Sequence, residues 1–176
     1  RGLGDVYKRP VKTLPGIEES YPDTLSGEEI PVFIACEKAD AYRQTMHSDE
    51  LIITADTIVW LDGLVMGKPE DEEDARRMLR CISSKTHQVI TGVCLTTTEF
   101  QKSFATVTDV TFAELTEEEI DYYVQKYKPM DKAGSYGIQE WIGFVGVEGI
   151  TGSYFNVMGL PIPVSYTHLT LPTICS

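Results

Sequence analysis

A strand–turn–strand pattern in residues 50–67 places the tightest constraint on the fold. The stretch reads ELIITADTIVWLDGLVMG and is rich in isoleucine, threonine and valine, which are typical of buried strands. Asp62 and Gly63 form a dipeptide that favours the tight turn of a β-hairpin, so LVMG is expected to return as the partner strand. The chain is therefore predicted to build a sheet around this hairpin.

Three segments have the pattern of helices. One begins near Pro31, since proline is tolerated in a first turn, and is expected to run to about Met46. Another, PEDEEDARRMLRCIS in residues 69–83, has acids at its start and arginines later, which suits the helix dipole. The last opens with a capping box formed by Thr116 and Glu119. The positions expected to be apolar and core-facing in the last two helices are Ala75, Met78, Leu79, Ile82, Ile120, Tyr123, Val124 and Tyr127.

Three more segments read as strands: THQVITGVCLTTT, SFATVTDVTFAEL and IGFVGVEGI. Helices and strands are interspersed along the chain, so we predict an α/β fold in which helices flank a mixed sheet. A length of 176 residues favours one domain.

The charge of the chain limits its partners. The formal net charge is −12, so polymeric nucleic acid and anionic membranes are unfavourable partners, and no apolar run is long enough for a membrane span. A small anion stays compatible if local lysines or a cation neutralise it. The four cysteines, Cys36, Cys81, Cys94 and Cys175, form no CxxC motif, so we expect reduced thiols, mostly buried, in a cytoplasmic protein.

Asp56 is an anomaly because it lies among strong strand formers. Aspartate is depleted in strands and is rarely buried without a partner. It either caps a turn at the strand end or supplies a functional carboxylate at the end of a sheet strand, where ligands collect in α/β folds. Thr57 beside it offers a hydroxyl for a ligand.

Other polar residues have a common and a functional interpretation. Lys68 in MGKP is a solvated turn residue or a partner of Asp56 or a phosphate, and Lys38 on the first helix taken alone points to solvent. The acids Glu18 and Glu19 form a solvated face, or join Asp56 in an oxygen-rich site for Mg²⁺ or Mn²⁺. His87 has no companion ligands, so a structural role is favoured.

The segment DKAGSYGIQEW in residues 131–141 has more polar chemistry than a surface turn requires. Its glycines allow the backbone to pass close to a ligand. Gln139 offers a donor and an acceptor, Lys132 pairs locally or lines a cleft, and Trp141 is expected in the core rather than under a base.

Several separated motifs together resemble the Maf family of nucleoside triphosphate pyrophosphatases. They are IEESYP, TADTIVWLDG, MGKP, THQVITGV, DKAGSYGIQEW and GSYFNVMGLP, in the family's order between about Val11 and Pro163. The resemblance implies two lobes around a nucleotide-binding cleft, hydrolysis of a nucleoside triphosphate to the monophosphate and pyrophosphate, and a divalent metal, Mg²⁺ or Mn²⁺. A homodimer is the expected assembly.

The resemblance also assigns site residues. The family's acidic site residues fall on Glu19 and Asp56, expected to be catalytic and to hold the metal, with Asp56 the candidate that activates water. Its catalytic lysines fall on Lys38 and Lys68 and its glutamine on Gln139. Thr57, Lys132 and Gln139 are expected to bind substrate, and AGSYGIQ is similar to the branch that acts on dTTP and UTP.

The two ends depart from the family. The segments 1–10 and 164–176 resemble translated adapter sequence, although an ordinary frayed terminus is the alternative, and the family's serine, proline and paired-arginine motif is not found before Val11. We therefore expect a single domain in residues 11–163 that lacks its first strand and helix and is weakly active or inactive.

Other classes of function compete with nucleotide hydrolysis. The main alternative is a non-catalytic nucleotide-binding regulator of cell division and septum formation. An aspartyl-phosphate phosphatase is disfavoured because Ile58 stands where a second aspartate is needed, and a dinucleotide-binding dehydrogenase because no GxGxxG follows a predicted strand.

Overall fold

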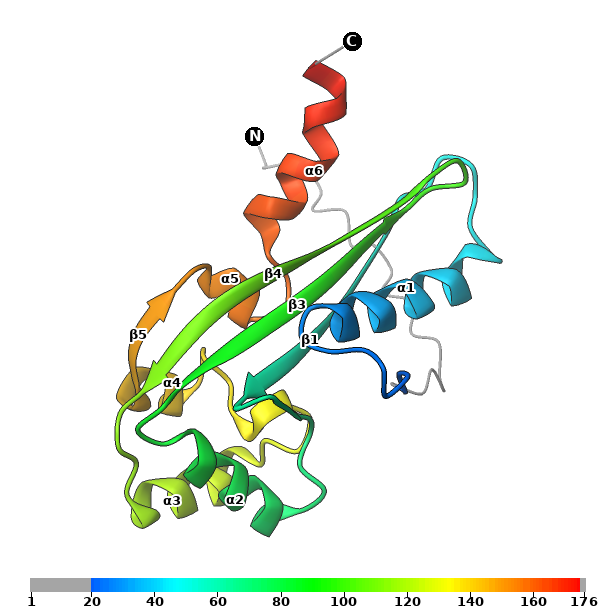
Figure 1. The fold of residues 1–176 in the computed structure, drawn as a ribbon. Coiled ribbons are helices and arrows are strands. Elements are labelled where there is room, and N and C mark those ends of the chain that lie inside the picture. Colours follow the sequence, from blue (N-terminus) through cyan, green and yellow to red (C-terminus); the bar gives the residue numbers. More distant parts are fainter. Residues whose placement is uncertain (1–19, 175–176) are drawn as a thin grey trace, which may run out of the picture.

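A long antiparallel sheet organises the molecule in a computed structural model that describes residues 20–174, with side chains up to His168 (Figure 1). Its strands are β1 (Ile52–Leu61), β2 (Leu64–Met66), β3 (Thr86–Thr96), β4 (Gln101–Phe112) and β5 (Val147–Thr151). Their order in the sheet is β2-β1-β3-β4-β5. The helices are α1 (Glu29–Arg43), α2 (Glu72–Ile82), α3 (Glu117–Tyr127), η1 (Ala133–Ser135), α4 (Trp141–Gly146), α5 (Tyr154–Val157) and α6 (Ile162–Ile174).

The predicted hairpin is confirmed. β1 and β2 pair in the register Val59 with Met66 and Leu61 with Leu64. Asp62 and Gly63 take φ values of 52° and 85° at the turn, the left-handed conformation that this dipeptide accepts most readily. β2 covers only the end of β1, so Ile52–Ile58 pairs on one side, with β3, among the described residues.

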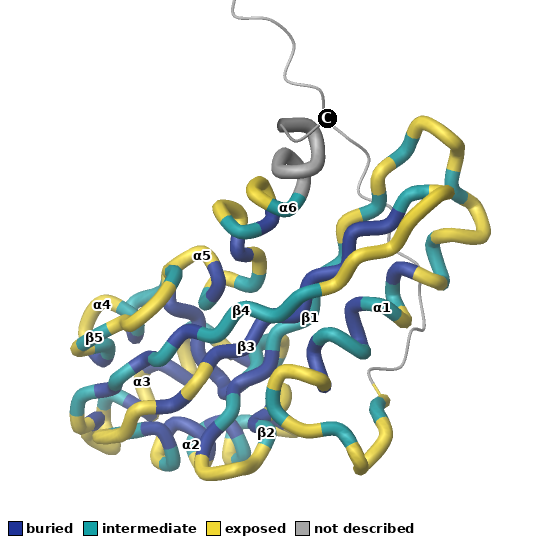
Figure 2. The backbone as a smooth tube through the Cα atoms, turned by 45° about the horizontal axis from the view of Figure 1, so that its top comes forward, coloured by how far each residue is buried: buried dark blue, intermediate teal, exposed yellow. Residues whose placement is uncertain are grey.

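Helix α1 packs on one face of the sheet because β3 has a glycine beneath it. A Cβ atom at Gly92 would lie 2.3 Å from the backbone of Pro31 and of Val32, so a larger residue would collide with the helix. Ile30 and Ile34 of α1 fill the interface with Ile58 and Ile90 of the sheet. Figure 2 shows this interface as buried segments along β3 and along α1.

A second and larger core lies at the other end of the sheet, where α2 and α3 gather (Figure 1). The predicted apolar stripes of these helices are buried except at Tyr127, which is partly buried. The predicted capping box of α3 is present, and the side chain of Asp71 caps α2. The predicted arrangement of helices flanking a sheet is thus confirmed, with one packed region on each side of the site described below.

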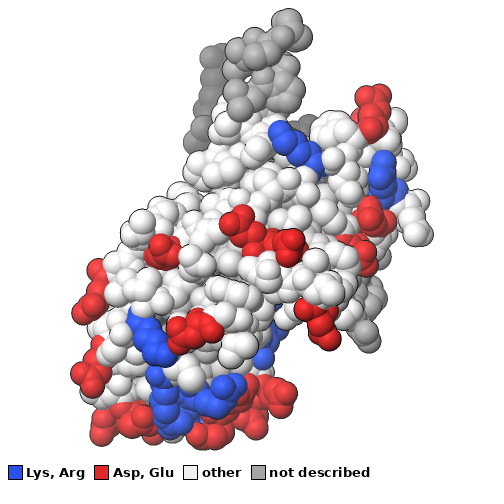
Figure 3. Space-filling view, in the orientation of Figure 1, with Lys and Arg blue, Asp and Glu red and all other residues white. Residues whose placement is uncertain are grey.

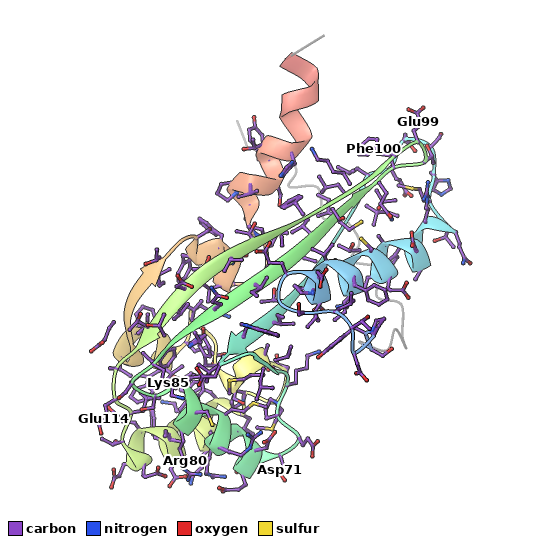
Figure 4. All side chains as sticks on the ribbon, viewed as in Figure 1. Asp71, Arg80, Lys85, Glu99, Phe100 and Glu114 are labelled. Atoms are coloured by element: carbon purple, nitrogen blue, oxygen red, sulfur yellow. The ribbon has the colours of Figure 1, made fainter. Side chains whose placement is uncertain are left out.

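Ion pairs join α2 and α3 on the surface. Arg76 contacts Asp121 at 2.6 Å, and Arg80 contacts Glu117 at 2.8 Å. Figure 3 shows the basic and acidic side chains mixed over this end of the molecule. Figure 4 labels Asp71 and Arg80 here, far from Glu99 and Phe100 at the β3–β4 turn. Exposed pairs of this kind contribute about 0–1 kcal/mol each, so the buried apolar stripes hold the helices together.

Two expectations about the sheet differ from the structure. All described strand pairings are antiparallel, whereas a mixed sheet was expected. Short turns join β1 to β2 and β3 to β4, which forces antiparallel pairing. The longer connections through α2 and through α3 and α4 also bring β3 and β5 back antiparallel to their neighbours. The segment IGFVGVEGI is a strand only in its second half, because Trp141–Gly146 forms helix α4, which buries Ile142 and packs Gly146 against Phe112.

The cysteines of the described part are Cys36, Cys81 and Cys94, and all three are free. Cys94 is buried, which raises the pKa of its thiol to about 11, whereas Cys36 and Cys81 are only partly buried. Cys175 lies outside the described residues. The cysteines were expected to be mostly buried, and among the described ones Cys94 is buried while Cys36 and Cys81 are partly buried.

The C-terminal segment forms helix α6, and Ser165 within it is buried. The ring of His168 stacks on Phe104 with centroids 4.1 Å apart. The adapter origin of residues 164–176 stays a prediction, as do the boundaries 11–163. Within residues 20–174, no helix is both long and apolar enough to cross a membrane.

Candidate functional site

A cleft of about 250 Å³ lies against residues 55–59 of β1. It gathers side chains from β1, the segment after β2, residues 131–139 and the end of α5. The predicted site residues that line it are Asp56, Thr57, Lys68, Lys132 and Gln139. Residues separated by more than 80 positions in the sequence therefore share one site.

The Asp56 carboxylate is held by a lysine from α1. The pleat of β1 places Asp56 on the same face as Ile58, which is the face that α1 covers. Lys38 Nζ donates to Asp56 Oδ1 at 2.6 Å, and the two side chains are 21% and 10% exposed. Lys38 taken alone was expected in solvent, whereas the family resemblance placed it in the site, and the position of the helix brings Lys38 onto the carboxylate.

Thr57 faces the other side of the sheet and begins a chain of hydrogen bonds. Its Oγ1 lies 2.8 Å from Thr91 Oγ1, and Thr91 donates to the carbonyl of Asn156 at 3.0 Å. The amide of Asn156 donates to the carbonyl of Val89 and to Thr108 Oγ1, both at 3.0 Å. These bonds fasten α5 to the sheet and so place Val157, Met158 and Gly159 on the cleft wall.

Asn156 was missed as a site-building residue. It is completely buried, and its side-chain NH₂ group donates two hydrogen bonds to residues of the sheet. The motif GSYFNVMGLP contains it, and a polar residue between Phe155 and Val157 was the available signal. A buried amide of this kind needs partners, so its presence in an apolar stretch indicates a fixed contact.

The segment 131–140 is anchored beside Lys68 by a glycine. Gly134 has a φ of 67° and donates its N–H to the carbonyl of Gly67 at 3.0 Å. A Cβ at Gly134 would lie 2.9 Å from Val59 Cγ2. The glycine was expected to let the backbone approach a ligand, but it is required here by the close packing on β1 and by the left-handed backbone.

Lys132 projects into the cleft between two carboxylates. Its Nζ lies 2.8 Å from Asp131 Oδ1 and 3.3 Å from Glu140 Oε1. Burial opposes the charge of Lys132, but the two carboxylates outweigh this effect and raise its pKa. Lys132 therefore both pairs locally and presents a fixed positive charge to the cleft.

Tyr136 lines the cleft and rests on a buried histidine. His87 Nε2 lies 2.8 Å from Tyr136 Oη, while His87 Nδ1 has no hydrogen-bond partner among the described residues. Burial lowers the pKa of His87 to about 4, so the imidazole is neutral near pH 7. This arrangement agrees with the structural role predicted for His87.

His87 should make the stability of the protein depend on pH. The unfolded imidazole takes up a proton near pH 6.5, whereas the folded one resists until about pH 4. The unfolded state binds more protons in this window, so the free energy of unfolding falls as the pH drops, by up to about 3 kcal/mol from this residue. Urea unfolding at pH 7 and pH 5 should show a smaller decline for His87→Gln than for the wild type.

The control for this measurement is His47→Gln, since His47 is exposed. That variant should keep the full decline of the wild type. An equal decline in the wild type and in His87→Gln would contradict the assignment.

Of the two carboxylates proposed to hold a metal ion, Asp56 lies among the described residues. Glu19, one of the two proposed metal ligands, lies outside the described residues. Within the described part of the chain, no group of three or more histidine, cysteine, aspartate or glutamate side chains could hold a metal ion. Asp56 is the proposed metal ligand that the structure places, and it lines the cleft.

A sequence profile described as Maf-like protein matches residues 4–171. The chain belongs to the Maf family. The Maf family match covers nearly the whole chain and includes every motif on which the resemblance rested. The recognition made from the sequence is thus confirmed.

Three relatives of this Maf protein carry the same name, dTTP/UTP pyrophosphatase. The one from Phocaeicola vulgatus is 75% identical over 168 residues, which is 96% of this chain and 86% of the relative. The one from Bacteroides thetaiotaomicron is 63% identical over the same shares. The one from Porphyromonas gingivalis is 51% identical over 160 residues, 90% of this chain and 80% of the relative.

Proposed function

We propose that this protein hydrolyses nucleoside triphosphates, with dTTP and UTP as preferred substrates, to the nucleoside monophosphate and pyrophosphate. The main supporting observation is that Asp56, which is paired with Lys38, lines a cleft that also presents Lys68, Lys132 and Gln139. A polyanion can enter this cleft in spite of the net charge of −12, because the site has its own cations. Relatives named dTTP/UTP pyrophosphatase support the reaction and weigh against a purely regulatory role.

The chemistry requires a water to attack phosphorus while a phosphoanhydride bond breaks. Asp56 activates the water by accepting its proton, and Lys38 keeps the carboxylate in place before the reaction. The new bond joins the water oxygen to phosphorus, and the bridging oxygen leaves with pyrophosphate. Lys68 stabilises the negative charge that spreads over the phosphoryl oxygens and the leaving group, and Lys132 binds the triphosphate through its fixed positive charge.

A divalent cation, Mg²⁺ or Mn²⁺, fits this donor set as an ion shared with the substrate. Mg²⁺ is commonly held by one or two carboxylates together with substrate phosphates, and Asp56 supplies one carboxylate, with Glu19 proposed as the second. When bound, the cation would neutralise phosphate oxygens and ease deprotonation of water. We expect chelation with EDTA to abolish hydrolysis and added Mg²⁺ or Mn²⁺ to restore it; hydrolysis that persists in EDTA would remove the metal from the proposal.

Selection of the base is assigned to Gln139 with help from Thr57. Gln139 is exposed at the cleft, and its amide can donate and accept, as a pyrimidine edge requires. Thr57 Oγ1 is fixed by Thr91 on the same wall. This pair supports a preference for dTTP and UTP.

The decisive test is pyrophosphate release measured with dTTP, UTP, CTP, ATP and GTP. The expected result is fastest release with dTTP and UTP. Reaction with guanine nucleotides alone would overturn the pyrimidine assignment, and nucleotide binding without release from any substrate would favour the regulator. The Phocaeicola vulgatus relative is the positive control.

The assembly proposed is a cytoplasmic homodimer without nucleic acid. Apolar side chains are exposed around the edge strand β5, and two copies could cover them. The exposed set is Phe144, Val145, Ile150, Tyr154 and Phe155. Sedimentation velocity at micromolar concentration should give a dimer, and a monomer would contradict this assembly.

A further inference from the structure

The carboxylate of Glu140 joins two elements on the border of the cleft. Its Oε2 accepts a hydrogen bond from Tyr123 Oη on α3, and its Oε1 lies 3.3 Å from Lys132 Nζ. The Glu140 side chain is only 20% exposed. Glu140 does not line the cleft, but its neighbour Gln139 does, and so does Lys132.

Tyr123 forms a second hydrogen bond to the segment that contains Glu140. Its side chain is fully buried, and its Oη accepts the backbone N–H of Gly137 at 3.0 Å. Burial, followed by the contact with Glu140, raises the pKa of Tyr123, so the phenol stays protonated and remains a donor. One phenol therefore fixes residues on both sides of Ile138 and Gln139.

The packing around the carboxylate leaves little freedom. A Cβ at Gly137 would lie 2.9 Å from Glu140 Cδ, so the glutamate lies directly against the glycine. A residue with a side chain at position 137 would push the carboxyl group away from its partners. The glycine and the glutamate thus define one arrangement of the segment 137–140.

We propose that Glu140 is a positioning residue for nucleotide binding, which holds Lys132 and the Gly137–Gln139 backbone in place along the cleft. It does not touch the substrate. It acts through the Lys132 ammonium and through the Tyr123 phenol, and the inference rests on the proposed function of the cleft. The Gln139 side chain is exposed, so its orientation depends on the backbone on either side of it. Tyr123 fixes this backbone through its hydrogen bonds to Gly137 and Glu140.

The test is a double-mutant cycle between Glu140→Gln and Lys132→Met. Glutamine keeps the shape and an acceptor for Tyr123 but loses the charge that holds Lys132. We expect Glu140→Gln to raise KM for dTTP about tenfold and to change kcat by less than about twofold. In the Lys132→Met background, the same change should alter KM by less than about twofold, because its target is gone. A KM that is unchanged in Glu140→Gln, or that rises equally in both backgrounds, would overturn the inference.

The matched control is Glu118→Gln, on the exposed surface of α3, which should leave KM unchanged. Gly137→Ala provides a second route to the same result, since its methyl group displaces the carboxyl group, and it should raise KM as Glu140→Gln does. Agreement of these two variants, with no effect of the control, supports positioning.

Amide hydrogen exchange of residues 131–141 in the free protein separates this inference from the proposed function. Glu140→Gln should accelerate exchange there and leave α2 unchanged. A wild type that releases no pyrophosphate would overturn the proposed function alone. An exchange rate that is the same with and without the Glu140 charge would overturn the positioning role, whatever the activity.

Discussion

Asp56→Asn is expected to lower kcat for dTTP hydrolysis by about 10³-fold while the protein still folds and binds nucleotide. Asparagine has nearly the same shape and can still accept a hydrogen bond from Lys38, but it cannot take a proton from water. Removing a negative charge beside the triphosphate should leave the affinity equal or greater. Steady-state pyrophosphate release and calorimetric titration with a non-hydrolysable dTTP analogue measure the two effects separately.

The control for this variant is Asp62→Asn, the same change at the exposed turn that ends β1. Asparagine tolerates the positive φ found there, so stability and kcat should stay close to wild type. If Asp56→Asn kept more than about a tenth of the wild-type kcat, Asp56 would not be the group that activates water.

Gly92→Ala is expected to reduce the free energy of unfolding by about 2–3 kcal/mol and to lower activity with it. The added methyl group would collide with the backbone of Pro31 and Val32 at 2.3 Å, and backbone cannot rotate away as a side chain can. Helix α1 must therefore move. Since α1 carries Lys38, the ion pair with Asp56 should weaken, and Gly92 is the direct strand neighbour of Asp56.

The control here is Gly149→Ala in β5, where a Cβ would meet nothing within 4 Å. Urea unfolding should place its midpoint near that of the wild type. A Gly92→Ala protein with wild-type stability and kcat would show that α1 can shift at little cost and that its close approach does not set the site.

Short-range patterns predicted most elements well. The hairpin turn at Asp62 and Gly63, the stripe of α2 and the capping box of α3 each depend on residues within about four positions of one another, and all three are confirmed. Sequence patterns predict helix starts and tight turns well because their hydrogen bonds join residues only a few positions apart. Helix α4 was missed because its strand-like composition is overridden by the burial of Ile142 in a distant core.

The site was predicted only in part for the same reason. Asp56, Lys68 and Gln139 stood out by type and motif, and they line one cleft. The partner of Asp56 could not be read from the sequence, because Lys38 reaches it across the interface between a helix and a strand. Asn156 and Glu140 escaped notice because each acts through hydrogen bonds to segments far away in the chain.

The sequence by itself determined the element types, the acidic surface and the family to which the chain belongs. Tertiary structure decided which charges meet: it put Lys38 on Asp56, Glu140 on Lys132 and Tyr123, and α5 against Thr91. The physical reason is that periodicity and turn preference are properties of neighbouring residues. An ion pair or a buried hydrogen bond instead requires packing to bring two atoms within about 3 Å of each other. For Lys38 and Asp56, the absence of a side chain at Gly92 allows α1 to lie close enough to the sheet.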